Sequence, residues 1–125
     1  MSSKGRPYRR FEIDGFEVLV GKSDEDNDHL TFDVAEPDDV WMHVARYSGS
    51  HVVIRNPEKL SVLPTPVLRR AAELAAWFSK GRDAGRVEVH CCRARDVSKP
   101  PGLPAGKVLL ADWRGVRVYP RAPAS

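Results

Sequence analysis

The stretch DDVWMHVARYSGSHVVIR, residues 38–55, contains two apolar runs separated by a turn-forming Tyr-Ser-Gly-Ser sequence. The first run alternates with the period of a β-strand, so its two faces carry Val40, Met42 and Val44 on one side and Trp41, His43 and Ala45 on the other. Two strands joined by a short turn favour an antiparallel pair. Such a pair gathers Trp41, His43, His51 and Arg55, while the turn geometry leaves their relative register open.

The preceding segment predicts a hairpin and a short helix. RRFEI and FEVLVG are two strand-like runs joined by Asp14-Gly15, a strong two-residue turn signal. The acidic loop KSDEDND follows, and its Asn27-Asp28 pair is expected to cap a short helix over HLTFDVA.

The following segment predicts one long helix and further strands. Thr65 is the expected cap, Pro66 the first helical residue and Gly81 the stop. Small apolar residues from Leu68 to Phe78 form a narrow face suited to lying on a sheet. Downstream, RVEVHCCRARDV is strand-like, SKPPGLPAG is irregular, and KVLLAD and VRVYP are strands joined at residues 113–115. The prediction is an α+β fold, with a mostly antiparallel sheet, one long helix and one short helix.

The chain length and composition indicate a single globular domain. The 125 residues leave no room for a second core, and a 42% hydrophobic fraction excludes a disordered chain. We expect a flexible basic arm at residues 1–10, the domain at 11–120 and a tail at 121–125. The sequence has no membrane-length apolar run and no signal peptide. The adjacent Cys91 and Cys92 cannot form a disulfide framework, which predicts a reducing, cytoplasmic location.

Charge is strongly segregated along the sequence. Residues 11–39 contain eleven acidic residues and one basic residue, Lys22, whereas residues 40–125 contain fifteen basic and six acidic residues. A basic face is typical of proteins that bind polyanions, because counterion release contributes affinity independently of base sequence. The alternative is that both kinds of charge only solvate the surface.

Neither a metal site nor a catalytic site is predicted. His43, His51 and His90 with a cysteine are the conceivable ligands, but the sequence has no Cys-x-x-Cys pair and no helical His-x-x-x-His pair. No nucleophile elbow or orienting carboxylate accompanies Ser50 or the cysteines. We therefore expect no metal, no cofactor and no enzymatic activity.

Phosphate binding fits the Gly49-Ser50 turn better than metal binding or catalysis does. Gly49-Ser50 allows a tight turn that presents backbone amides and a hydroxyl to phosphate oxygens. Positive charge near it is expected from Arg46, Arg55, Lys99 and Lys107. His43, His51 and Trp41 are candidates for contacting phosphate or stacking on an unpaired base. The alternatives are a core role for Trp41 and a strand-pair hydrogen bond for the histidines, with Trp77 and Trp113 as packing residues.

The order of motifs over residues 11–120 resembles the NFACT-R domain, the RNA-binding domain of the NFACT family, found in large proteins such as RqcH and NEMF. The resemblance is carried by the Asn-Asp-x-Leu step, the Asp-x-Trp-x-His strand, the Gly-Ser-His-Val turn and VSKPPGLPAGK. It implies a functional surface at the family's recurrent positions: Asn27, Asp28, Trp41, His43, Gly49, Ser50, His51, Lys99 and Gly106. The chain departs from the family at Ser23, Ser48, Ser98 and Pro101, so its basic loop carries fewer lysines.

The resemblance implies a standalone bacterial form of the domain that binds structured RNA, tRNA or ribosomal RNA, through phosphate, ribose and shape. The large ribosomal subunit and a protein of ribosome rescue or RNA modification are the implied partners. Two alternatives stay open. The acidic segment 11–39 could serve a protein-interaction adaptor, or the chain could be an accessory or catalytic subunit of an RNA-modifying enzyme.

Overall fold

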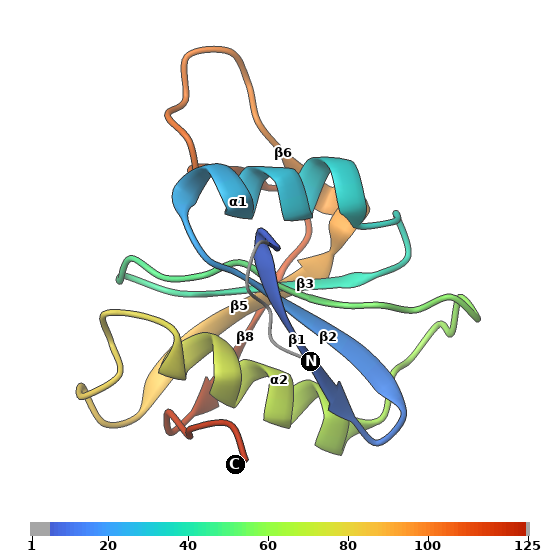
Figure 1. The fold of residues 1–125 in the computed structure, drawn as a ribbon, viewed down its shortest axis with the longest axis vertical. Helices are drawn as coiled ribbons and strands as arrows, with labels where there is room; N and C mark the ends of the chain where they lie inside the picture. Colours follow the sequence, from blue (N-terminus) through green and yellow to red (C-terminus); the bar gives the residue numbers. More distant parts are fainter. Residues whose placement is uncertain (1–5, 125) are drawn as a thin grey trace.

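The protein folds into three layers, with one helix on each face of a central antiparallel sheet (Figure 1). A computed structural model describes residues 6–124. Six strands form the sheet in the order β1-β2-β4-β3-β5-β8, and every neighbouring pair is antiparallel. The α+β fold with a mostly antiparallel sheet is therefore confirmed.

The first two strands form the predicted hairpin. Strand β1 (Tyr8–Ile13) pairs with β2 (Phe16–Gly21) across Asp14-Gly15. Both turn residues have positive φ, 49° and 87°, as a type I′ turn requires. Because β1 already begins at Tyr8, residues 8–10 are a paired strand and not part of a flexible arm, while residues 1–5 of the predicted arm lie outside the described residues.

The quoted stretch forms the centre of the sheet. Strand β3 (Val40–Val44) pairs antiparallel with β4 (Val52–Ile54), with Trp41 opposite Val53. The two faces of β3 enter different cores, as the alternation predicts. The even-numbered residues pack in one core with helix α2 (Thr65–Trp77), and Trp41 packs in a second core with Leu30.

Helix α2 (Thr65–Trp77) covers one face of the sheet with small side chains. Ala71, Ala72 and Ala75 are fully buried, as expected for a helix that lies close to a sheet. The cap is Pro64 and not Thr65, and the helix ends at Trp77 and not near Gly81. The chain leaves the helix at Phe78 because its backbone then bonds to the β3–β4 connection, with Ser50 N–H donating to Phe78 O at 2.9 Å.

The other face is covered by α1 (Asp24–His29), which continues into a π-helical segment, η1 (Leu30–Val34). The Ser23 hydroxyl caps this helix by accepting from Asp26 N–H at 3.1 Å. The predicted cap at Asn27-Asp28 is therefore wrong, because those residues lie inside the helix. The two segments together are nearly as long as α2, so the predicted contrast of a long and a short helix was overstated. Among residues 6–124, neither helix has the length and apolar character to cross a membrane.

The C-terminal strands were predicted as neighbours but belong to different sheets. Strand β5 (Val87–Arg93) pairs with β3 and with the edge strand β8 (Arg114–Val118). After a 3₁₀ turn, η2 (Ala94–Asp96), the short strand β6 (Val97–Ser98) pairs with β7 (Leu109–Leu110). The Pro/Gly loop between β6 and β7 reverses the chain above α1, so β7 meets β6 before the chain returns to the main sheet.

The C-terminal tail runs along α2. Arg70 on that helix donates from Nη2 to Ala122 O at 2.7 Å and from Nη1 to Arg121 O at 3.2 Å. The described part of the tail is therefore bonded to the domain.

The central position of β3 predicts the effect of truncating its core side chain. Met42→Ala removes a fully buried side chain from the core under α2 and should lower the free energy of unfolding by about 2–5 kcal/mol. Val62→Ala, at a residue that is 79% exposed, is the control and should change it by less than about 0.5 kcal/mol. Urea denaturation measures both. Equal effects of the two substitutions would contradict the assigned core.

Candidate nucleic-acid interface

The structure brings three of the predicted site residues together as a cluster of rings. The centroids of Trp41 and His43 are 6.1 Å apart and nearly parallel, and His51 meets both edge-on, at 5.0 Å from Trp41 and 5.6 Å from His43. The register of β3 and β5 adds His90, which lies directly opposite His43. An aromatic row thus crosses the sheet on the α1 side.

A chain of hydrogen bonds fixes the protonation of His51. Trp41 donates from Nε1 to Thr31 Oγ1 at 3.0 Å, and Thr31 Oγ1 lies 2.8 Å from His51 Nδ1. On its other side, His51 Nε2 lies 3.1 Å from Gly106 O. Since a carbonyl can only accept, the Nε2 nitrogen carries the proton, and Nδ1 accepts from the Thr31 hydroxyl. Every member of this hydrogen-bond chain is satisfied only while the imidazole is neutral.

Burial agrees with a neutral His51. Desolvation, and to a smaller extent the neighbouring His43, lower the pKa of His51 to about 4 against the opposing effects of Gly106 O and Asp28. Desolvation also lowers the pKa of the half-buried His43, with smaller contributions from the charges of His90 and Lys107. Both imidazoles are therefore uncharged at neutral pH.

Asn27 holds the β3–β4 turn against α1. Its Oδ1 accepts from the backbone N–H of His51 at 3.0 Å, and its Nδ2 donates to Gly49 O at 3.5 Å. A Cβ on Gly21 would lie 2.0 Å from that Oδ1, so only glycine admits this contact. The Ser50 hydroxyl donates to Gly21 O at 2.6 Å. The conformation of the Gly-Ser-His turn thus depends on the buried side-chain amide of Asn27 on helix α1.

Asp28 and Lys99 fix the Pro/Gly loop. Asp28 Oδ1 accepts from Gly106 N–H at 3.1 Å, and Lys99 Nζ lies 3.3 Å from the other carboxylate oxygen. The same ammonium donates to Pro104 O and Lys107 O, each at 2.6 Å. All three donors of Lys99 are therefore engaged within the protein, and its role here is to shape the loop.

Two pockets flank the turn and share its residues 48 and 49. The first, which we call the histidine pocket, has a volume of about 350 Å³ and is lined among others by His43, His90, Gly106, Lys107, Leu109 and Trp113. The second, the serine pocket, has about 340 Å³ and includes Ser23, Ser50, Ser79, Lys22, Lys80 and Arg82 in its lining. The two pockets therefore lie next to each other, and Lys107, Lys80 and Arg82 are the exposed cations in their linings.

The structure changes the roles of several predicted site residues. Trp41 and His51 belong to the lining of the histidine pocket, but each is only 1% exposed, so they support it from inside and offer almost no surface to a ligand. Arg55 does not join the cluster, because it follows β4 whereas His51 precedes it. Its Nε lies 2.9 Å from the buried Asp39 at the opposite end of the strand pair. Arg46 is exposed in the connection after β3.

The predicted set of RNA-binding residues did not include several residues that line these pockets, among them His90, Trp113, Lys80 and Arg82. Trp113 was expected to be a packing residue, yet it is 47% exposed, with its ring 4.2 Å from that of His90. The alternation in RVEVHCC could have placed His90 on the same face as Glu88 and Cys92, but not opposite His43.

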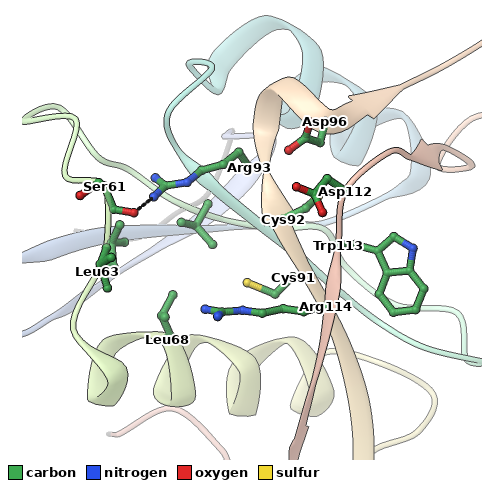
Figure 2. Close-up of a pocket in the computed structure, with 12 residues that line it drawn as sticks. Ser61, Leu63, Leu68, Cys91, Cys92, Arg93, Asp96, Asp112, Trp113 and Arg114 are labelled. Atoms are coloured by element: carbon green, nitrogen blue, oxygen red, sulfur yellow. Dashed lines mark hydrogen bonds between the residues drawn. The ribbon is translucent and has the colours of Figure 1, made fainter.

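The cysteines lie at another pocket, of about 300 Å³, whose lining also includes Arg93, Trp113 and Arg114 (Figure 2). Burial raises the pKa of Cys91 and raises that of Cys92 to about 12. Arg93 is engaged by the carbonyls of Asp38, Leu60 and Ser61. Protonated thiols are poor nucleophiles, so this pocket offers no activated group. Among residues 6–124, no three His, Cys, Asp or Glu side chains are grouped to hold a metal ion.

Comparison with known proteins identifies the domain. A family model described as the NFACT protein RNA-binding domain matches residues 6–112. The chain belongs to this NFACT-R family. Rqc2 homolog RqcH of Bacillus subtilis is 40% identical to it over 108 residues, which cover 86% of this chain and 18% of that protein. Ribosome quality control complex subunit 2 of Saccharomyces cerevisiae is 32% identical over 106 residues, 78% of this chain and 10% of that protein.

A solved structure confirms the fold of this NFACT-R domain. The C-terminal part of the fibronectin/fibrinogen-binding protein of Streptococcus suis superimposes with a TM-score of 0.84 at 36% identity, covering 96% of this chain and 47% of that one. The NFACT-R chain spans about a fifth of the length of the bacterial relative that it matches. It corresponds to the RNA-binding module within such proteins.

The depressed pKa of His51 predicts acid sensitivity between about pH 6.5 and pH 4. In this range the unfolded chain binds a proton at His51 that the folded chain does not, so the free energy of unfolding falls as the pH falls. The contribution of this residue is at most roughly 3 kcal/mol over the range. His51→Gln cannot titrate and keeps an amide donor for Gly106 O. Urea unfolding at several pH values should show a shallower pH dependence for this variant, and identical slopes would refute the assignment.

Proposed function

We propose that this chain binds structured RNA, tRNA or ribosomal RNA, and that it reads phosphate, ribose and shape more than base sequence. The proposal rests on the match of residues 6–112 to the NFACT RNA-binding domain. It places the protein in ribosome-associated quality control or tRNA processing in the cytoplasm, with the large ribosomal subunit and a protein of those pathways as candidate partners.

The surface around residues 48–50 supports a phosphate-binding role. Lys107 lies at the histidine pocket, and Lys80 and Arg82 lie at the serine pocket. The Lys80 side chain is exposed, and the Lys80 backbone N–H donates to Ser48 O at 2.8 Å, which holds the cation beside the turn. Cations on both sides of a concave turn suit the negatively charged backbone of a nucleic acid.

The turn itself is rigid, which favours recognition of a defined RNA shape. Asn27 donates to Gly49 O, and Ser50 N–H donates to Phe78 O. Gly49 also forms a β-bridge with Ser79. A preorganised surface loses little conformational entropy when a ligand binds. The buried Trp41 and His51 contribute to RNA binding indirectly, by maintaining this shape.

The acidic side chains of α1 and η1 remain exposed at Asp24, Glu25 and Asp33. They repel phosphate, and they border the proposed surface at Asp24, which lines both pockets. RNA is therefore expected to approach from the side of the basic residues and to avoid the outer face of α1. A basic protein that docks on the acidic segment is the rival function.

The test is fluorescence anisotropy with total tRNA at salt concentrations between about 50 and 200 mM. We compare the wild type with Lys80→Glu/Lys107→Glu. The control, Lys59→Glu/Arg69→Glu, makes the same change in net charge at exposed residues outside both pockets. Wild-type affinity should fall steeply with salt. The pocket variant should bind more weakly and lose about 2 from the slope of log Kd against log salt, because each lysine at a phosphate contributes about 1.

The outcomes separate the candidate functions. Equal losses in the pocket and control variants would mean that overall charge and not this surface attracts RNA. No binding of the wild type at low salt would refute the RNA-binding proposal. The rival adaptor function would be supported by a basic protein that binds the wild type, the pocket variant and the control variant alike. Charge reversal of the acidic residues in α1 should then abolish this binding.

A further inference from the structure

The floor of the histidine pocket consists of aromatic rings that belong to the sheet. His43 and His90 lie opposite each other on neighbouring strands, and Trp41 lies nearly parallel to His43 beneath the α1 layer. These side chains come from β3 and β5, the central part of the fold, so their positions are fixed before any ligand arrives. The floor is therefore aromatic and held in place by the sheet.

Trp113 forms one side of this pocket and is held there. Its ring lies 4.2 Å from that of His90, at an interplanar angle of 44°, while 47% of the residue remains exposed. Trp113 also belongs to the lining of the neighbouring pocket at Cys91 and Arg93, but in Figure 2 its indole extends away from those two side chains. Leu109, which is 53% exposed, lines the same hollow. A held but half-exposed indole facing a hollow is a preformed stacking platform.

The size and charge of the pocket suit one nucleotide better than a charged side chain. A volume of about 350 Å³ lies at the lower end of the range for small-molecule sites. Desolvation lowers the pKa of the half-buried His43, so its ring is neutral at neutral pH, and the lining also includes the exposed cation of Lys107 and the exposed carboxylate of Asp24. A planar, uncharged base whose phosphate lies at Lys107 matches this arrangement of an aromatic floor with a lysine at its edge.

We propose that the histidine pocket receives one unpaired nucleobase, which stacks on Trp113 while its backbone phosphate lies at Lys107. The inference rests on the proposed RNA-binding function and adds to it a requirement for a single-stranded nucleotide. It also moves the stacking role from Trp41, which is buried, to Trp113, which is exposed. A duplex cannot supply such a base without breaking a pair, so loops, bulges or ends are the preferred elements.

The experiment measures the affinity of the full chain for two RNAs of equal length, a hairpin with an unpaired loop and a fully paired duplex. The variants are Trp113→Ala, which removes the platform, and Trp113→Phe, which keeps an aromatic face. Phe32→Ala is the matched control, because Phe32 is an aromatic residue of similar exposure, 40%, that lies on η1 outside the pocket. Thermal unfolding verifies that each variant remains folded.

The wild type should prefer the hairpin. Trp113→Ala should weaken hairpin binding by about 5- to 150-fold, the range found when a stacking aromatic is truncated, and should leave duplex binding unchanged. Trp113→Phe should restore most of the preference, and Phe32→Ala should match the wild type.

Two results would overturn the inference in distinguishable ways. If the wild type binds hairpin and duplex equally, with strong salt dependence and no effect of Trp113→Ala, the base pocket is wrong while the phosphate-based function stands. If neither RNA binds at low salt, the proposed function fails and the base pocket fails with it. A Trp113→Ala variant that loses hairpin and duplex binding equally would also contradict base capture.

Discussion

The neutral imidazole of His51 is the constraint around which the candidate surface is organised. Its two nitrogens connect η1 to the Pro/Gly loop, through the Thr31 hydroxyl on one side and Gly106 O on the other. Its backbone N–H is bound by Asn27, which also reaches the turn at Gly49. His51 therefore joins the helical segment α1–η1, the Pro/Gly loop and the β3–β4 turn. If the His51 ring were protonated, its Nδ1–H would face the Thr31 hydroxyl, which donates to Nδ1 in the neutral state. The hydrogen bonds from His51 to Thr31 and Gly106 O and from Trp41 to Thr31 could then not all persist in their present form.

Several acidic residues form bonds inside the fold, whereas several basic residues remain exposed at the pockets. Several residues of the acidic segment are used inside the fold: Asp28 binds Gly106 and Lys99, and Asp39 accepts from Asn56 N–H and lies against Arg55. Lys99 and Arg55, two of the cations expected to contact RNA, are therefore paired with carboxylates inside the protein. The cations left at the pocket rims, such as Lys80 and Lys107, are exposed and can exchange counterions for phosphate. Segregation of charge along the sequence is thus a poor guide to which residues meet a ligand.

The residues at the motif positions lie around one candidate surface, but they make different contacts there. Asn27, Asp28, Trp41, His51 and Lys99 are engaged in bonds or packing inside the protein, whereas His43, Gly49 and Lys107 are more accessible in the pocket lining. A residue that recurs in a family can be required because a rigid site needs buried supports as much as contacts. The exposed Trp113 lies beyond the quoted motifs, and only its packing against His90 reveals its place in the pocket.

Local sequence patterns predicted the two faces of β3, the Asp14-Gly15 hairpin and the approximate position of α2. These features follow from local periodicity and turn chemistry, which need no information from distant segments. The tertiary structure decided the register that places His43 opposite His90, the pairing of β7 with β6, and the burial of Trp41 and His51. Register and burial depend on contacts between segments far apart in the chain, such as residue 51 with residue 106, and no local pattern encodes those distances.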